Sequence, residues 1–486
     1  MPHTPISRRD FLRGTAAGVV TLALDPRVHA ATAATTQSPN IIFIMADDLG
    51  YADVGCYGRN DIHTPQIDGL AARGIRFLQG YANSSVCSAT RVALITGRYQ
   101  YRLRVGLEEP LGGNPDVGLD PSHPTLPALL RKAGYRTALV GKWHLGALPK
   151  FGPLQSGYDD FFGFRGGAVD YYTHSAGGKK DLWDDDLPVD QAGYLTELLG
   201  DRSVEVVNNY AKGRQPFFLS LHFSTPHWPW EAPGDQAEAA RLSQPGTHGG
   251  LFHYDGGTQA TYRRMIESMD QQIGRVVQTL ESNGLLENTI VVFTSDNGGE
   301  RFSNTWPFSG RKTELLEGGL RIPTIISWPA RLPAGRTTEQ VAITMDWLPT
   351  LLAAAGTAPD REYPPDGINL LPLLANGATP VSRKLFWRFK ANGQRAVRDG
   401  DLKFLKMQEN TFLFHVVDDP LERANLKDRR PEEFRRLVRE WYDWNTSMLP
   451  EITESNSGGL EGSTAADRYG VKRGDGKPDR PTPPQD

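Results

Sequence analysis

Four short apolar runs in the chain each end abruptly in polar side chains. The first run, IIFIMA at residues 41–46, is followed directly by Asp47 and Asp48. Runs without alternation of apolar and polar positions are typical of strands buried on both faces of a parallel sheet. The other three predicted strands are residues 137–140, 217–223 and 289–294, followed by Lys142 and His144, by His227, and by Asp296 and Asn297.

Helical patterns lie between these strands. Residues 64–74, 123–134 and 261–284 have helical spacing, and the first two end at Gly74 and Gly134. Strands that alternate with helices predict an α/β fold, with a large, mostly parallel sheet sandwiched by helices. Ligands of such sheets bind outside the carboxyl ends of the strands, so we expect the polar residues that follow the strands to converge.

The pattern changes near residue 380. Short strands are predicted at residues 384–388, 394–398, 402–406 and 411–416, followed by a helix at 431–444. This indicates a smaller C-terminal antiparallel sheet with a helix packed on it. We therefore divide the chain into a large α/β domain, 36–379, a small α+β subdomain, 380–453, and a flexible tail, 454–486, which has few large apolar residues.

The first 35 residues have the pattern of an export signal. Arg8 and Arg9 precede a mild apolar run at 14–24 that is too short to span a bilayer, and small residues follow. This segment resembles a twin-arginine signal, which would deliver a folded protein through the twin-arginine export machinery to the periplasm or outside the cell. No later apolar stretch is long enough for a membrane helix, so we expect a protein that is not membrane-embedded.

The amino-acid composition excludes some classes of function and favours others. The chain of 486 residues is 39% hydrophobic and 23% charged, with a formal net charge of −4, which gives no basic surface for nucleic acid. Its 51 glycines and 35 prolines indicate many loops, where functional residues concentrate. A globular enzyme fits these values.

The polar residues at the strand ends fall into two chemical groups. Asp47, Asp48, Asp296 and Asn297 offer only oxygen ligands, which suit Ca²⁺ or Mg²⁺ better than zinc, and three crowded carboxylates would repel one another without a cation. The second group is basic and suits the binding of an anionic oxyacid ester, because cationic side chains neutralise the charge on the ester oxygens and can protonate the leaving group. It consists of Lys142, His144, His227 and Lys312, each of which, taken singly, has an ordinary structural explanation.

Cys87 stands in a run of small polar residues just before an apolar helical segment. At a helix start the dipole would lower the pKa of its thiol and make the sulfur reactive. A disulfide with Cys56, the other cysteine, is an alternative for an exported protein. An ordinary cysteine nucleophile, however, needs a histidine base and has no need of a divalent cation, so this position requires another explanation.

The segments CSATRVALITGR, residues 87–98, and GKWHLG, residues 141–146, resemble the two signatures of the type I sulfatase family in the alkaline phosphatase superfamily. The resemblance extends to ADDLGYADVGCYG, TSDNGG and GRKTELLEGGLRIP, and it spans nearly the whole mature chain. It implies an alkaline phosphatase-like fold and the conversion of Cys87 to formylglycine by a formylglycine-generating maturation enzyme. Ala89 stands where many members of the family have proline, and the family pattern tolerates alanine at this position.

The resemblance also implies a role for each site residue. Asp47, Asp48, Asp296, Asn297 and the formylglycine oxygen from Cys87 would bind the cation, Ca²⁺ with Mg²⁺ as the alternative. Arg91 would orient the formylglycine hydrate. Lys142, Lys312 and His227 would hold the sulfate, with His227 or Lys312 as the acid for the leaving oxygen. His144 would deprotonate the second hydroxyl of the hydrate.

The expected reaction is hydrolysis of a sulfate monoester of a sugar or aryl alcohol. Residues 157–174 resemble arylsulfatase B-like enzymes, which remove the 4-sulfate of N-acetylgalactosamine. The aromatic residues Trp228, Trp230, Tyr171 and Tyr172 could stack on a sugar ring or simply pack in the protein. Two alternatives are a phosphate or phosphonate monoester hydrolase of the same superfamily and a non-catalytic exported binding protein.

Overall fold

The computed structural model describes residues 38–244, 253, 256–375 and 378–452. The predicted export signal and the predicted tail lie outside the described residues, and the domain boundary at residue 380 stays a prediction. Among the described helices, none is both long and apolar enough to cross a membrane. Cys56 and Cys87 are both free, so the alternative of a disulfide between them was wrong.

A ten-stranded sheet forms the centre of the fold, in the order β13-β2-β12-β11-β1-β10-β4-β5-β8-β9. Its middle strands are parallel: β11 (Thr289–Ser295), β1 (Asn40–Ala46), β10 (Phe217–His222), β4 (Arg136–Lys142) and β5 (Asp160–Phe164). The edges include antiparallel pairs, with β13 (Arg336–Thr338), β2 (Ile75–Phe77) and β12 (Thr324–Ser327) on one side and β8 (Trp183–Asp184) and β9 (Leu187–Pro188) on the other. The four strands predicted from apolar runs are confirmed as the four neighbours at the centre.

The register of these strands aligns their carboxyl ends. Met45 of β1 lies opposite His222 of β10, and Ala46 lies opposite Ser295 of β11. His222 in turn lies opposite Gly141 of β4. The residues that follow these strands therefore leave the sheet at one edge, as the sequence predicts.

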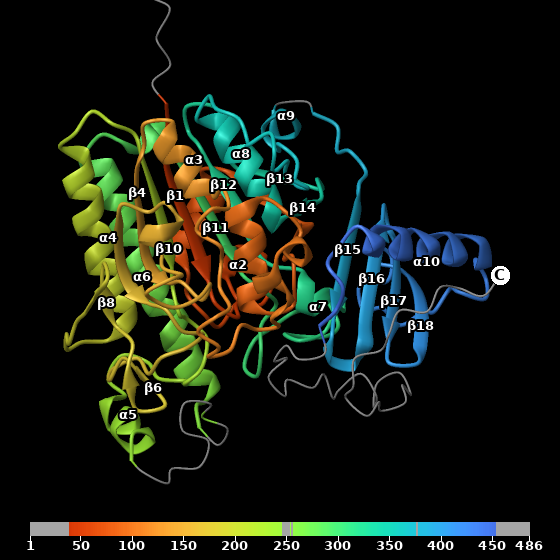
Figure 1. The fold of residues 1–486 in the computed structure, drawn as a ribbon, viewed down its shortest axis with the longest axis horizontal. Helices are drawn as coiled ribbons and strands as arrows, with labels where there is room; N and C mark the ends of the chain where they lie inside the picture. The colour runs from red at the N-terminus through yellow and green to blue at the C-terminus, as the bar shows by residue number, and fades with distance from the viewer. Residues whose placement is uncertain (1–37, 245–252, 254–255, 376–377, 453–486) are drawn as a thin grey trace, which may run out of the picture. The chain divides into compact units, whose positions relative to one another are not determined.

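Helices cover both faces of the large sheet, which explains the uninterrupted apolar run of β1 (Figure 1). Ile42 and Ile44 pack in one core with α1 (Pro65–Ala72), α4 (Leu195–Ala211) and α6 (Gln259–Ser282). Phe43 and Met45 pack in the opposite core with α2 (Cys87–Thr96), α3 (Leu126–Lys132) and α8 (Trp347–Ala354). The predicted mostly parallel α/β sandwich is confirmed.

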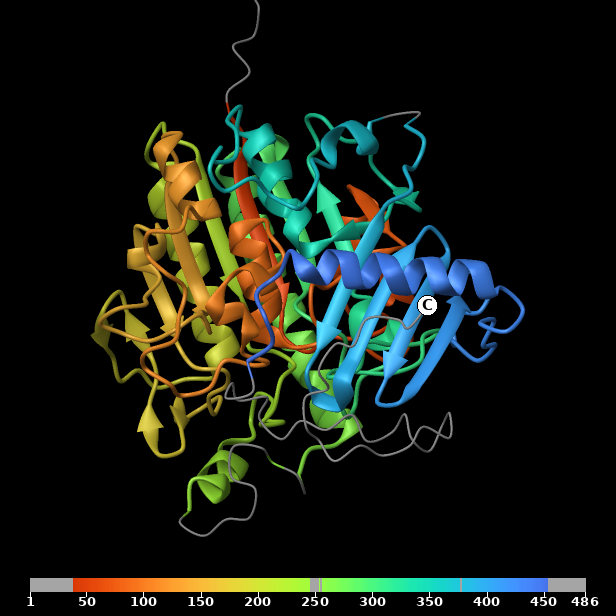
Figure 2. The ribbon, with the colours of Figure 1, turned by 45° about the vertical axis from the view of Figure 1, so that its right-hand side comes forward.

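A second sheet contains β15 (Lys384–Phe389), β16 (Gln394–Asp399), β17 (Leu402–Met407) and β18 (Asn410–His415), all antiparallel. Figure 2 shows α10 (Pro431–Thr446) lying across these strands, and Leu437 and Trp441 pack against Val397 and Phe404 there. The other face of the sheet packs through residues such as Trp387 on a core that includes the start of α2. The predicted C-terminal sheet and helix are confirmed.

Shorter elements complete the described fold. Two of them, β3 (Gly80–Tyr81) and β14 (Ala342–Ile343), pair in parallel, and β6 (Ser175–Ala176) pairs with β7 (Lys179–Lys180). The remaining α-helices are α5 (Gln236–Leu242), α7 (Glu317–Leu320) and α9 (Leu371–Leu374).

Candidate active site

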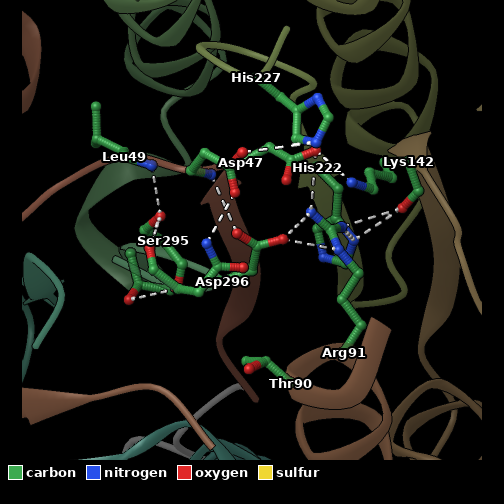
Figure 3. Close-up of polar contacts among 12 residues, drawn as sticks. Asp47, Leu49, Thr90, Arg91, Lys142, His222, His227, Ser295 and Asp296 are labelled. Carbon is green, nitrogen blue, oxygen red and sulfur yellow. Dashed lines mark hydrogen bonds and ion pairs between the residues drawn. The ribbon is translucent and has the colours of Figure 1, made fainter. Parts of the chain in front are cut away.

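Three buried carboxylates meet at the carboxyl ends of β1 and β11 (Figure 3). Asp47, Asp48 and Asp296 each offer an oxygen, and these oxygens all lie within 4.8 Å of one another. The backbone N–H of Asp48 donates to Asp296 Oδ1 at 3.2 Å, and Asn297 Nδ2 donates to Asp48 Oδ1 at 2.8 Å. The acidic group predicted from two separate strand ends is therefore brought together.

Each carboxylate is paired with a basic side chain. Lys142 Nζ lies 2.5 Å from Asp47 Oδ2, and Lys312 Nζ lies 2.6 Å from Asp48 Oδ2. Arg91 extends from α2 to Asp296, with its Nη2 2.8 Å from Oδ2 (Figure 3). These pairs connect the residues that follow β1 and β11 with the end of β4, with α2 and with the loop that carries Lys312.

Ionisation of the carboxylates depends on these neighbours. Burial, and then the charge of Asp296, raise the pKa of Asp47 well above its usual value, although Lys142 and Arg91 oppose the shift. Burial also favours the neutral form of Asp296, but Arg91 and Lys142 together lower its pKa below the usual value. Burial and the repulsion between like charges thus make it unfavourable for Asp47 and Asp296 to be ionised together unless positive charge is close.

The donor atoms fit a hard divalent cation. Asp47 Oδ1 and Asn297 Oδ1 are buried and have no hydrogen-bond partner within the described part of the chain. A buried acceptor without a partner is costly, and a bound cation would satisfy both oxygens. Carboxylate and amide oxygens are the ligands that Ca²⁺ and Mg²⁺ prefer. The residues present therefore fit the predicted cation.

Cys87 is the first residue of α2 and lies next to Asp47 of this acidic cluster. Val86 has an extended backbone, and the helix runs from Cys87 to Thr96, ending at Gly97 with a left-handed φ of 68°. The Cys87 Sγ and ligand atoms of Asp47 and His227 lie within 4.8 Å of one another. Burial raises the pKa of the thiol, even though Lys142 and Lys312 lie near it. The expectation of a lowered thiol pKa at the helix start was therefore wrong, because loss of solvation raises the pKa more than the two nearby lysines lower it.

The two predicted histidines make their backbone hydrogen bonds through different ring nitrogens. His144 Nε2 lies 3.0 Å from the carbonyl of Leu111, so Nε2–H donates there and Nδ1, which is buried, is left as the basic nitrogen. His227 Nδ1 lies 2.7 Å from the carbonyl of Trp228, and its Nε2 lies 3.5 Å from Asp48 Oδ2. Burial and nearby lysines lower the pKa of both imidazoles well below the usual value.

The structure adds His222, which sequence reasoning missed. It is the last residue of β10, and its Nδ1 lies 3.4 Å from Arg91 Nη1 and 3.3 Å from the carbonyl of Lys142. Burial, and then Arg91, lower its pKa to about 3, so the ring is neutral. A histidine inside the apolar run FFLSLHF was the available signal, but the run was read only as a strand.

Of the four aromatic residues considered for sugar stacking, most serve in packing. Tyr171 is fully buried and donates to the carbonyl of His227 at 3.0 Å. Trp230 is buried against Phe302. The hydroxyl of Tyr172 donates to the carbonyl of Ala232. Trp228 is partly exposed, and its ring lies 4.1 Å from that of His227, so it borders the site.

Known proteins are similar to this chain over most of its length. The sulfatase family model matches residues 39–357, a range that includes every predicted site residue. N-acetylgalactosamine-6-sulfatase of Canis lupus familiaris is 31% identical over 406 residues, which cover 76% of this chain and 72% of the relative. Arylsulfatase J of Mus musculus is 29% identical over 494 residues, covering 89% and 80% of the two chains.

Among solved structures, the crystal structure of Ps i-CgsB in complex with k-i-k-neocarrahexaose is similar to this chain, with a TM-score of 0.75 and 30% sequence identity. The similarity covers 89% of this chain and 97% of that one. It therefore extends over both the large sheet and the small C-terminal sheet.

Proposed function

Because this chain belongs to the type I sulfatase family and is a sulfuric ester hydrolase, we propose that its nucleophile is a formylglycine hydrate made from Cys87. The observation that carries this proposal is the place of Cys87, buried at the start of α2 beside Asp47 and His227. Burial raises the pKa of the thiol, which disfavours an ordinary thiolate nucleophile. A maturation enzyme that supplies the oxidant would convert the side chain to an aldehyde, whose hydrate carries two hydroxyls.

The carboxylate cluster would hold the divalent cation. Asp47, Asp48, Asp296, Asn297 and an oxygen of the hydrate are its proposed ligands, and Ca²⁺ is the first candidate, with Mg²⁺ the alternative. When bound, the cation would lower the pKa of the attacking hydroxyl and polarise a sulfate oxygen. The unpartnered oxygens of Asp47 and Asn297 support this assignment.

In the first chemical step, one hydroxyl of the hydrate would lose its proton to water, and its oxygen would form a bond to sulfur. The bond between sulfur and the alcohol oxygen breaks, and that oxygen takes a proton from Lys312 or from the imidazolium form of His227, which the negative charge of the bound sulfate would favour. Lys142, Lys312 and His227 hold the sulfate oxygens, and Arg91 orients the hydrate. Basic groups around a transferring anionic group stabilise the charge that develops there.

In the second step, His144 removes the proton of the remaining hydroxyl. The carbonyl bond re-forms, the bond between carbon and the sulfate oxygen breaks, and sulfate leaves with the electron pair. Water then adds to the aldehyde and restores the hydrate. The proton acceptor is the buried Nδ1 of His144, because Nε2 faces the carbonyl of Leu111.

The proposed substrate is a sulfated saccharide. The relatives include N-acetylgalactosamine-6-sulfatase, and the similar structure of Ps i-CgsB holds an oligosaccharide. The partly exposed ring of Trp228 beside His227 would suit stacking on a sugar. A panel of sulfated mono- and disaccharides tests this, and activity confined to choline sulfate or alkyl sulfates would refute it.

The mechanism is tested by a mass spectrum of the peptide that carries residue 87, taken from active enzyme. Replacement of the thiol by an aldehyde supports the proposal, and an intact cysteine in fully active enzyme refutes it. Sulfate and phosphate esters of one phenol are compared in parallel. A clear preference for the phosphate ester would favour the phosphate or phosphonate hydrolase instead.

We also propose that the mature enzyme is exported through the twin-arginine machinery, after Cys87 has been modified. The paired Arg8 and Arg9 support this route, which carries folded cargo. Fractionation of cells that express an Arg8→Lys, Arg9→Lys double variant tests it. Unchanged export of the double variant would contradict the proposed route.

A further inference from the structure

Lys312 lies in a turn whose next residue has an unusual backbone conformation. Thr313 has a φ of 72°, in the left-handed region, which a β-branched residue rarely adopts. Such a conformation persists only where surrounding contacts hold it. The contacts of Thr313 therefore bear on where the Lys312 side chain points.

The turn is closed by a hydrogen bond from the N–H of Glu314 to the carbonyl of Arg311, and contacts from outside the turn hold it further. The N–H of Thr313 donates to the carbonyl of Ser85 at 2.9 Å. Gln394 Nε2 donates to the carbonyl of Thr313 at 2.8 Å, and the N–H of Leu315 donates to Gln394 Oε1 at 2.8 Å. One side-chain amide thus binds the backbone on both sides of residue 314.

The amide of Gln394 is itself fixed. The residue is only 1% exposed, and its Nε2 also donates to the carbonyl of Ala391 at 3.1 Å. Gln394 is the first residue of β16 and lies opposite Phe389 of β15. The small C-terminal sheet therefore supplies a rigid support for the Lys312 turn.

The same turn connects the two sides of the catalytic cluster. Ser85 lies two residues before Cys87, and the N–H of Lys312 donates to the carbonyl of Gly299, in the loop that follows Asp296 and Asn297. Lys312 Nζ lies 2.6 Å from Asp48 Oδ2. A shift of Thr313 would therefore move Lys312 relative to both Cys87 and the carboxylates.

We infer that Gln394 is a positioning residue for the sulfatase reaction: it holds Thr313 in its left-handed conformation and thereby places the Lys312 ammonium beside the reacting sulfate. This inference rests on the proposed role of Lys312. If so, the small sheet contributes to catalysis as well as to packing, because removal of the Gln394 side-chain amide would displace the Lys312 ammonium without opening the site to solvent.

The decisive comparison is between Gln394→Ala and Gln340→Ala. Gln340 is also fully buried, and its Oε1 accepts from the N–H of Val381, on the segment that leads into the small sheet. Both variants lose a buried amide that links the small sheet region to the rest of the protein, but only Gln394 touches the Lys312 turn. Activities are normalised to the formylglycine content at residue 87, and thermal unfolding is recorded for each variant.

We expect Gln394→Ala to lower kcat by about 10- to 100-fold, as small misplacements of catalytic groups do. Gln340→Ala should lower the unfolding temperature to a similar degree with kcat near the wild-type value. Asparagine tolerates the left-handed region better than threonine, so Thr313→Asn in the Gln394→Ala background should restore most of kcat.

Equal kcat values for Gln394→Ala and Gln340→Ala would overturn the inference, as would failure of Thr313→Asn to restore kcat in a folded double variant. Lys312→Ala separates this failure from that of the proposed function. If Lys312→Ala keeps wild-type turnover, the proposed role of Lys312 fails. If it is inactive while Gln394→Ala matches Gln340→Ala, only the positioning role of Gln394 fails.

Discussion

Arg91 donates two hydrogen bonds to a single carboxylate oxygen of Asp296, from Nη2 at 2.8 Å and from Nε at 3.2 Å. Both side chains are buried, so the pair is shielded from solvent and its geometry is constrained. It joins the helix that begins with Cys87 to the end of β11. Asp296 is a proposed cation ligand and Arg91 is proposed to orient the nucleophile, so this contact sets the relative positions of the two.

Arg91→Lys keeps the positive charge but cannot reproduce the paired bonds of the guanidinium. We expect kcat to fall by at least about 100-fold, because the helix start that carries residue 87 would no longer be oriented. Steady-state kinetics on protein with verified circular dichroism and formylglycine content measures this. Wild-type turnover in the variant would contradict the role assigned to Arg91.

His222→Ala removes one of the two contacts of Arg91 Nη1, since the carbonyl of Lys142 remains within 3.4 Å. We expect a decrease in kcat of about tenfold, smaller than that of Arg91→Lys, and a milder one for His222→Asn, which can keep a polar contact. The pKa of His222 is lowered to about 3, so neither variant should change the pH profile at neutral pH. A displaced profile would show that His222 titrates during turnover.

Asp47→Asn should weaken binding of the divalent cation. A ligand at 100 times its Kd stabilises a folded protein by about 2.7 kcal/mol, so Ca²⁺ added to chelator-treated wild type should raise the unfolding temperature and restore activity. The variant should lose both effects. Asp235→Asn, at the partly exposed ion pair with Arg264, serves as control and should respond to Ca²⁺ like the wild type. A full response of Asp47→Asn to Ca²⁺ would refute its role as a ligand.

Cys87→Ser would have one hydroxyl where the hydrate has two. Its oxygen could accept the sulfo group and release the alcohol, but no second hydroxyl would remain to expel sulfate. We expect a covalently sulfated protein, seen by mass spectrometry of the intact chain, and no sustained turnover. Cys87→Ala should remain unmodified. Continuous turnover by Cys87→Ser would argue against the elimination step.

Glu231 should make stability dependent on pH. Burial, and then the charge of Asp170, raise its pKa from 4.5 to about 9. A carboxyl whose pKa is raised on folding contributes stability that is fully present below pH 4.5 and is lost as the pH rises toward 9. Each pKa unit corresponds to about 1.4 kcal/mol. Glu231→Gln keeps an acceptor for the N–H of Tyr171 and removes the titration.

Thermal unfolding of wild type and Glu231→Gln across this pH range tests the effect. The two should unfold at similar temperatures in acid, and the variant should become the more stable one as the pH rises. Glu205→Gln is the control, because that side chain is 62% exposed and should leave the pH dependence unchanged. Parallel curves for wild type and Glu231→Gln would contradict the prediction.

Most of the architecture could be predicted from the sequence, because strands such as β1 are recognised from the apolar pattern of a few consecutive residues. A strand with apolar residues on both faces has to be covered on both sides, and Asp47 directly after it has to leave at the carboxyl edge. The same reasoning placed Asp296 and Lys142 at that edge. The signature around Cys87 and Arg91 then indicated the family.

Contacts across distant segments could not be predicted in this way. Nothing local relates Gln394 to Leu315, 79 positions away, or assigns Arg91 to Asp296 and Lys142 to Asp47. The expectation for the pKa of Cys87 was wrong for the same reason. The helix start is visible in the sequence, whereas the loss of solvent arises only in the packed chain, where Val86 and Ala89 join a core with residues of the small sheet. Local sequence specifies elements and their ends, but desolvation and hydrogen-bond partners are properties of the packed chain.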